Sequence, residues 1–103
     1  MKNITVEELK QKMDSGEHIN LIDCREPHEY AEFNLGGKLV PLGKIQTMQI
    51  DDIEDLRNEE VICYCRSGNR SGTSALILEQ LGFTNTKNLV GGMLEWQEKF
   101  KSK

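Results

Sequence analysis

The sequence lacks the features of a membrane-spanning or exported chain. No apolar run approaches the ~18 residues that a membrane-spanning helix requires. No apolar signal-peptide region follows the first five residues, which lead directly into a helical pattern. We therefore expect a cytoplasmic protein without a membrane partner.

The chain also has few cysteines and no surplus of positive charge. Its three cysteines, an odd number in a chain without a secretion signal, indicate reduced thiols. The net charge of −4 argues against a nucleic-acid partner, because nucleic-acid-binding surfaces are usually basic. The spacing of Cys63 and Cys65 is not typical of a zinc site, and the two histidines lie at unrelated positions, so no metal is expected.

The rest of the composition predicts a small globular protein. The chain has 103 residues, of which 37% are hydrophobic and 29% charged, and it contains no internal repeat or low-complexity segment. These numbers suit one domain, residues 1–103, with one hydrophobic core. We expect a monomer.

Short apolar runs alternate with helical patterns along this chain. Thr5 and Glu8 form a capping-box pattern before a helix that ends near residue 15. Strands are predicted at residues 3–4, 19–23, 38–40, 61–64 and 86–90. Further helices are predicted from residue 27, over residues 71–81 and from residue 92, whereas residues 42–58 are ambiguous. The alternation indicates an α/β fold with a mainly parallel sheet, whose ligands gather where the strands end.

Cys65 follows one of these predicted strands, in a loop that leads into a helix. Such a loop directs backbone N–H groups at one point, where the helix dipole adds partial positive charge. Gly68 and Asn69 tolerate the positive φ angles of a tight loop, and Arg66 and Arg70 add full positive charge. These features favour a thiolate, so we expect the pKa of Cys65 to lie below the ~8.5 of a free cysteine. The sequence thus predicts a nucleophilic cysteine in an anion-binding loop.

For each candidate residue, a purely structural role is the alternative. Cys65 could be a buried cysteine at a strand end, although the polar and cationic residues that follow it argue against this. Cys63 lies within the predicted strand and is expected in the core. Cys24 is expected to pack in the core or to act as a second thiol near Cys65. His28 is expected at the surface or behind the site.

The spacing between Cys65 and Arg70, together with the absence of a clear general base, distinguishes among the reactions that a nucleophilic cysteine can perform. A protein-phosphatase loop has five residues between its cysteine and its arginine, whereas four lie between Cys65 and Arg70. A cysteine protease needs a general base, and only His28 could serve. Sulfur transfer needs no such base, because sulfite leaves thiosulfate as a stable anion when a thiolate attacks the outer sulfur.

Four motifs resemble, in order, those of the rhodanese family of sulfurtransferases, specifically the small single-domain kind. They are residues 21–30, 36–42, 64–71 and 89–96, and the resemblance extends over nearly the whole chain. The resemblance implies a rhodanese-like three-layer sandwich, with an open five-stranded parallel sheet and helices on both faces. It also implies that Cys65 carries a persulfide and that no cofactor is needed. The backbone N–H groups expected to bind the terminal sulfur are those of Arg66, Ser67, Gly68, Asn69 and Arg70.

The same resemblance implies supporting roles and shows two departures. Asp23 and Arg25 would support the loop, and Trp96 would pack the last helix. The family usually has an apolar residue where this chain has Cys24, which suggests disulfide or trisulfide exchange with Cys65. Residues 34–38 differ from the family's usual run, so the entrance to the third strand is expected to differ.

The function implied by the resemblance is that of a thiosulfate sulfurtransferase with a ping-pong cycle. The donor would be thiosulfate or another sulfane-sulfur compound. The acceptor would be cyanide or a thiol, with thioredoxin, glutathione or a biosynthetic enzyme as candidates. The alternatives are a catalytically silent rhodanese-like binding or regulatory module, which the presence of Cys65 disfavours, and a phosphatase or arsenate reductase, which the loop length disfavours.

Overall fold

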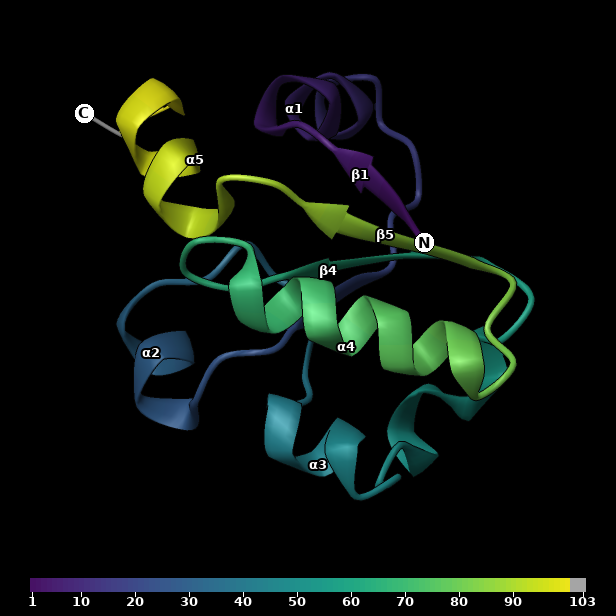
Figure 1. Cartoon of the computed structure of the whole chain (residues 1–103). Coiled ribbons are helices and arrows are strands. Elements are labelled where there is room, and N and C mark those ends of the chain that lie inside the picture. The colour runs from purple at the N-terminus through teal and green to yellow at the C-terminus, as the bar shows by residue number, and fades with distance from the viewer. Residues whose placement is uncertain (101–103) are drawn as a thin grey trace.

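The computed structural model describes residues 1–100 and has a parallel sheet of five strands at its centre (Figure 1). The strand order is β1-β5-β4-β2-β3, and every neighbouring pair is parallel. The strands are β1 (Lys2–Ile4), β2 (Leu21–Asp23), β3 (Lys38–Leu39), β4 (Glu60–Tyr64) and β5 (Asn85–Leu89). The predicted α/β fold is therefore confirmed.

Helices cover both faces of this sheet, as expected. They are α1 (Val6–Asp14), α2 (Pro27–Glu32), α3 (Leu42–Gln46), α4 (Asn69–Gln80) and α5 (Gly92–Phe100), with a 3-10 helix at Asp51–Leu56. The ambiguous residues 42–58 thus form α3 and the 3-10 helix. Thr5 and Glu8 form the predicted capping box of α1. The helix expected over 71–81 begins at Asn69, two residues earlier, because the chain turns at Gly68, whose φ of 100° places it before the first helical turn.

Alternating side chains of the sheet divide the core into two layers. Val61 and Cys63 of β4 face α3, α4 and the 3-10 helix, whereas Ile62 and Tyr64 face α1 and α5. This alternation follows from the two-residue period of a strand. The central strand β4 is therefore covered on both faces. Burial of each large apolar side chain stabilises the fold by about 1.5–3 kcal/mol, so β4 contributes to the stability of both layers.

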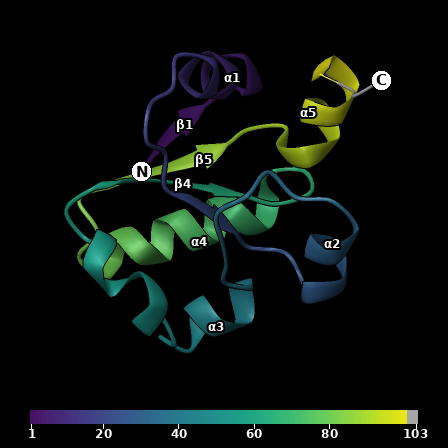
Figure 2. The same cartoon turned by 180° about the vertical axis from the view of Figure 1, so that it is seen from behind.

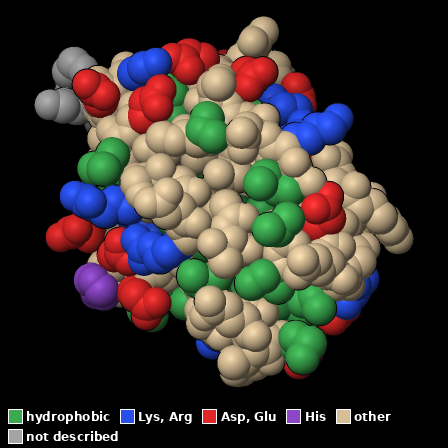
Figure 3. All heavy atoms as spheres, in the orientation of Figure 1, with side chains coloured by type: hydrophobic (Ala, Val, Ile, Leu, Met, Phe, Trp, Pro, Cys, Tyr) green, Lys and Arg blue, Asp and Glu red, His purple; other side chains and the backbone are tan. Residues whose placement is uncertain are grey.

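The carboxyl ends of the strands meet the beginnings of α2, α4 and α5 at one end of the molecule. Figure 1 shows this end at the left, and Figure 2 shows it from behind, with α2 and α5 on either side of the loop between β4 and α4. Acidic and basic side chains are interspersed on the face shown in Figure 3. None of the helices in residues 1–100 has the length and apolar character needed to cross a bilayer.

Candidate functional site

Cys65 begins the loop that joins the central strand β4 to α4, and its sulfur lies under the first turn of that helix. The Sγ atom accepts hydrogen bonds from the N–H of Gly68 at 3.1 Å and from the N–H of Ser71 at 3.3 Å. The Ser71 hydroxyl lies 3.3 Å from the same sulfur. Cys65 is buried, with 1% of its surface exposed. The sulfur is therefore surrounded by donors that stabilise a negative charge.

These donors determine how readily Cys65 ionises. Burial of the thiol disfavours the thiolate, but hydrogen bonds from the Ser71 hydroxyl and from the backbone of Ser71, Gly68 and Ser67 outweigh burial. The pKa of Cys65 consequently lies below its ordinary value. The first turn of α4 adds its dipole to these hydrogen bonds.

The residues predicted to bind the outer sulfur lie around the same loop. Arg66, Ser67 and Asn69 have exposed side chains, and Asn69 is the first residue of α4. Gly68 adopts the positive φ angle that the sequence suggested, and its N–H points to the sulfur. Of the predicted set, Gly68 directs its N–H at the cysteine sulfur, and Arg66 has an exposed side chain.

Arg70 does not contribute a free positive charge, contrary to the sequence analysis. Its guanidinium donates to both carboxylate oxygens of Glu29 in α2, at 2.8 and 3.0 Å. Arg70 in turn holds the pKa of Glu29 well below its usual range, at about 2. The ion pair neutralises one of the two expected cations and ties α2 to α4.

The beginning of α5 holds the Cys65 loop from the other side. Met93 N–H donates to the Cys65 carbonyl and Leu94 N–H to the Arg66 carbonyl, each at 2.9 Å. A Cβ atom on Gly92 would lie 2.6 Å from both carbonyl oxygens. Only glycine permits this approach, which explains the second glycine of the last motif, Gly92.

Asp23 and Arg25 form a buried ion pair behind the site. The Arg25 guanidinium donates to the two Asp23 carboxylate oxygens at 2.9 and 2.7 Å, and to the Phe33 carbonyl at 2.6 Å. It also lies over the Tyr64 ring, 5.6 Å from the ring centre. The pair thus fixes the segment that follows α2, which faces the Cys65 loop.

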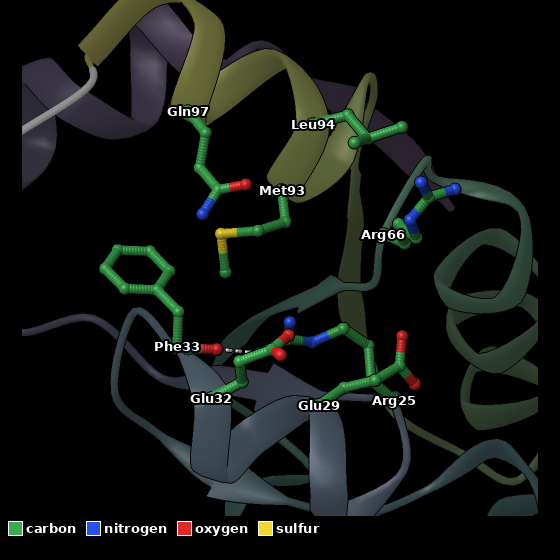
Figure 4. Close-up of a pocket in the computed structure, with 8 residues that line it drawn as sticks. All are labelled: Arg25, Glu29, Glu32, Phe33, Arg66, Met93, Leu94 and Gln97. Atoms are coloured by element: carbon green, nitrogen blue, oxygen red, sulfur yellow. Dashed lines mark hydrogen bonds between the residues drawn. The ribbon is translucent and has the colours of Figure 1, made fainter.

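A cavity of about 110 Å³ opens between α2 and α5 beside the Cys65 loop (Figure 4). The apolar side chains come from α5 and from Phe33, which follows α2, whereas α2 itself contributes two glutamates and Arg66 comes from the loop. The lining residues are Arg25, Glu29, Glu32, Phe33, Arg66, Met93, Leu94 and Gln97. Because Arg25 and Glu29 are paired with other charges, Arg66 is the cation best placed to meet an incoming anion.

The other candidate residues have the structural roles that the sequence allowed. Cys63 is fully buried, and its contact with the Cys24 thiol and its burial raise its pKa well above the ordinary value. Cys24 is equally buried, on the same sheet face. His28 is exposed at the beginning of α2. Trp96 packs edge-on against Phe100 in α5, as expected of a packing residue.

Three residues that lie at the site were not predicted from the sequence. Ser71 is a donor to Cys65, Glu29 is the partner of Arg70, and Asn88 of β5 contacts the Ser71 hydroxyl. Asn88 carried a usable signal, since it is a polar residue near the carboxyl end of a buried strand. Within residues 1–100, no group of three or more His, Cys, Asp or Glu side chains is placed to hold a metal ion.

Comparison with known proteins identifies the family. Residues 5–99 match the model of the rhodanese-like domain. The chain is 35% identical to "Putative sulfur carrier protein YrkF" of Bacillus subtilis over 93% of its own length, and 39% identical to "Putative thiosulfate sulfurtransferase, mitochondrial" of Schizosaccharomyces pombe over 81%. It spans 51% of the first relative and 66% of the second.

Solved structures agree with this match. A rhodanese-like domain protein from Staphylococcus aureus superposes with a TM-score of 0.81 and 31% sequence identity, covering 93% of this chain and 91% of that one. The fold, the cysteine loop and the sequence relationship together show that the chain belongs to the rhodanese-like domain family.

Proposed function

We propose that the protein is a sulfurtransferase in which Cys65 accepts a sulfane sulfur and then donates it. The observation that carries this proposal is the set of donors on Sγ, from Gly68 N–H, Ser71 N–H and the Ser71 hydroxyl. They stabilise the thiolate that must attack the donor. The relatives named as a sulfur carrier protein and as a thiosulfate sulfurtransferase support the same reaction class.

The first half-reaction, with thiosulfate as donor, balances without a general acid. The Cys65 thiolate attacks the outer sulfur, a sulfur–sulfur bond forms, and the bond to the sulfonate sulfur breaks. Sulfite leaves with its electron pair, so the total charge is unchanged. The loop amides of residues 66–70 would hold the negative outer sulfur of the resulting persulfide.

In the second half-reaction, a thiolate or cyanide attacks the outer sulfur and Cys65 leaves as the thiolate. The donors on Sγ then stabilise the leaving group as they stabilised the nucleophile. No cofactor enters either step. We further propose that thiosulfate is the donor and that a thiol such as thioredoxin or glutathione is the acceptor. The proposal includes a single domain, a monomeric state and a cytoplasmic location.

The position of Arg70 favours sulfur transfer over phosphate-ester hydrolysis. A phosphatase arginine binds the phosphate oxygens, whereas Arg70 is engaged by both oxygens of Glu29. The loop is also one residue shorter than a phosphatase loop requires. The loop of residues 66–70 is therefore better suited to bind one sulfur atom than three phosphate oxygens.

The test is thiosulfate:cyanide sulfurtransferase activity, followed as thiocyanate, in the wild type beside Cys65→Ala. We expect activity in the wild type alone, together with a mass increase of one sulfur atom on the peptide that contains Cys65. A folded wild-type protein that forms no persulfide with thiosulfate or with an organic persulfide would support the silent binding module instead.

A further inference from the structure

The Ser71 hydroxyl has two acceptors and one proton. Its oxygen lies 3.3 Å from Cys65 Sγ and 2.5 Å from Asn88 Oδ1, and all three side chains are buried. A hydroxyl donates a single hydrogen bond, so it can serve only one of these acceptors at a time. The sulfur and the amide oxygen therefore compete for the same proton.

The orientation of the Asn88 side chain follows from its second contact. Its Nδ2 atom donates to the Gly68 carbonyl oxygen at 3.1 Å, and a carbonyl can only accept. The amide oxygen must then face Ser71. Asn88 thus contacts Gly68 and Ser71, whose amides both donate to the sulfur.

We propose that Asn88 is a positioning residue that acts on Cys65 through Ser71, by holding the hydroxyl proton whenever the sulfur carries no negative charge. In the thiol form, the S–H donates to the Ser71 oxygen and the hydroxyl donates to Asn88. When the thiol loses its proton to solvent, the hydroxyl turns to the thiolate and leaves Asn88 Oδ1. A bond to a charged acceptor is the stronger one, so the hydroxyl leaves Asn88 for the thiolate, and the loss of the bond to Asn88 offsets part of the stabilisation that the thiolate gains.

The transfer of the Ser71 hydrogen bond between the sulfur and Asn88 also affects the stability of the persulfide; this step rests on the proposed function. Once the sulfur–sulfur bond forms, the negative charge lies on the outer sulfur and Sγ is neutral. The hydroxyl then returns to Asn88, and the bond that stabilised the attacking thiolate is released. Asn88 would thereby stabilise the thiol and the persulfide relative to the free thiolate.

Other charged or titratable groups surround the sulfur and set the background against which Asn88 acts. The Cys63 thiol of β4 and the Cys24 thiol, which follows β2, lie together on one face of the sheet. A guanidinium follows the sulfur in the loop, and an ion pair joins the first turn of α4 to α2. These groups are Cys24, Cys63, Arg66, Arg70 and Glu29. Within residues 1–100, the Asn88 side chain forms hydrogen bonds with Ser71 and Gly68 and with none of these groups, so substitutions at residue 88 leave them in place.

The test is the pH profile of Cys65 alkylation by iodoacetamide, quantified by mass spectrometry on the peptide that contains Cys65. Ser71→Ala removes the hydroxyl donor, so the midpoint of the pH profile should move to higher pH. The alkylation rate below that midpoint should fall about tenfold. Asn88→Leu removes the competing acceptor with a similar branched shape. It should move the midpoint to lower pH and raise the acid-side rate about threefold.

The double variant distinguishes competition from simple support of the loop. If Asn88 acts through Ser71, Asn88→Leu should change nothing in the Ser71→Ala background. If Asn88 merely braces Gly68, its loss should slow alkylation in both backgrounds. The Gly68 carbonyl keeps the Gly72 N–H as a partner at 3.1 Å, so its backbone is not left unpaired. Slower alkylation, or an unchanged profile, in Asn88→Leu would overturn the proposal.

Two buried hydroxyls provide matched controls. Ser74 lies one turn after Ser71 in α4, and Thr86 lies two residues before Asn88 on β5; neither hydroxyl has a hydrogen-bond partner among the described residues. Ser74→Ala and Thr86→Val should leave the profile unchanged. If Asn88→Leu unfolds, as judged by circular dichroism, Asn88→Val is smaller and must give the same shift. Alkylation requires no sulfur donor, so failure of the proposed function would not obscure the result.

Discussion

Glu29 and Arg70, 41 positions apart in the sequence, join α2 to the first turn of α4 through two hydrogen bonds of 2.8 and 3.0 Å. The same turn supplies the Ser71 donors to the Cys65 sulfur. The ion pair therefore holds one wall of the cavity against the helix that positions the sulfur.

Substitution Glu29→Gln tests this connection through the pH dependence of stability. The Arg70 hydrogen bonds lower the pKa of Glu29 to about 2, from an ordinary value of 4.5. Because the folded-state pKa is lowered, the stabilisation is complete above the unfolded-state value and is lost as pH falls from about 4.5 to 2. Urea unfolding should show that Glu29→Gln costs up to about 1 kcal/mol at neutral pH and progressively less below pH 4.5.

The matched control is Glu98→Gln, an exposed residue of α5. It should leave the unfolding free energy unchanged across the same pH range. A difference between wild type and Glu29→Gln that stays constant down to pH 2 would contradict the role assigned to the ion pair.

Substitution Gly92→Ala should displace the cysteine loop. The added Cβ would lie 2.6 Å from the carbonyl oxygens of Cys65 and Arg66, and the φ of 56° is unfavourable for alanine. We expect a loss of more than about 1 kcal/mol of stability and a decrease in sulfurtransferase activity on the order of a hundredfold. Gly43→Ala, in open space within α3, is the control and should leave both unchanged or raise stability. Equal behaviour of the two variants would show that the approach of Gly92 is unimportant.

Substitution Arg66→Ala should weaken binding of an anionic donor. Arg66 lines the cavity, and within residues 1–100 its guanidinium forms no ion pair with a carboxylate, unlike those of Arg25 and Arg70. We expect KM for thiosulfate to rise about threefold with little change in kcat, and the difference to shrink as salt is added. Lys44→Ala, in α3 away from this cavity, serves as the control. A loss confined to kcat would instead place Arg66 in the chemical step.

Substitution Cys24→Ala decides between core packing and sulfur exchange. Cys24 is fully buried against Cys63, so we expect sulfur transfer to persist while stability falls by about 1 kcal/mol. Steady-state assays and urea unfolding measure the two effects. Loss of activity in a folded Cys24→Ala protein would assign Cys24 to the exchange reaction.

Much of the fold was predictable because its signals are local. The capping box of Thr5 and Glu8 and the apolar run before Cys65 each lie within a few residues. Their alternation was enough to predict a parallel α/β sheet and to place Cys65 where a strand ends. The four motifs then predicted the rhodanese-like architecture, which the strand order and the family match confirm.

The electrostatics of the site were less predictable. The sequence identified Arg70 as a positive charge of the loop, but its pairing with Glu29 was not predictable because Glu29 lies in a separate helix. Asn88 was not assigned because its contact with Ser71 spans 17 positions and depends on β5 lying beside β4. Such contacts depend on strand order and helix docking, which local patterns do not specify.

The sequence by itself determined that a cysteine follows a buried strand, that a glycine-containing loop leads from it into a helix, and that the chain is an α/β protein. These follow from hydrophobic periodicity and turn chemistry over a few residues. Only the tertiary structure decided which charges remain free, which backbone carbonyls meet Gly92, and which acceptor competes for the Ser71 proton. Each of these depends on groups from different elements meeting in a low-dielectric interior, where a displacement of an ångström changes which partner is bound.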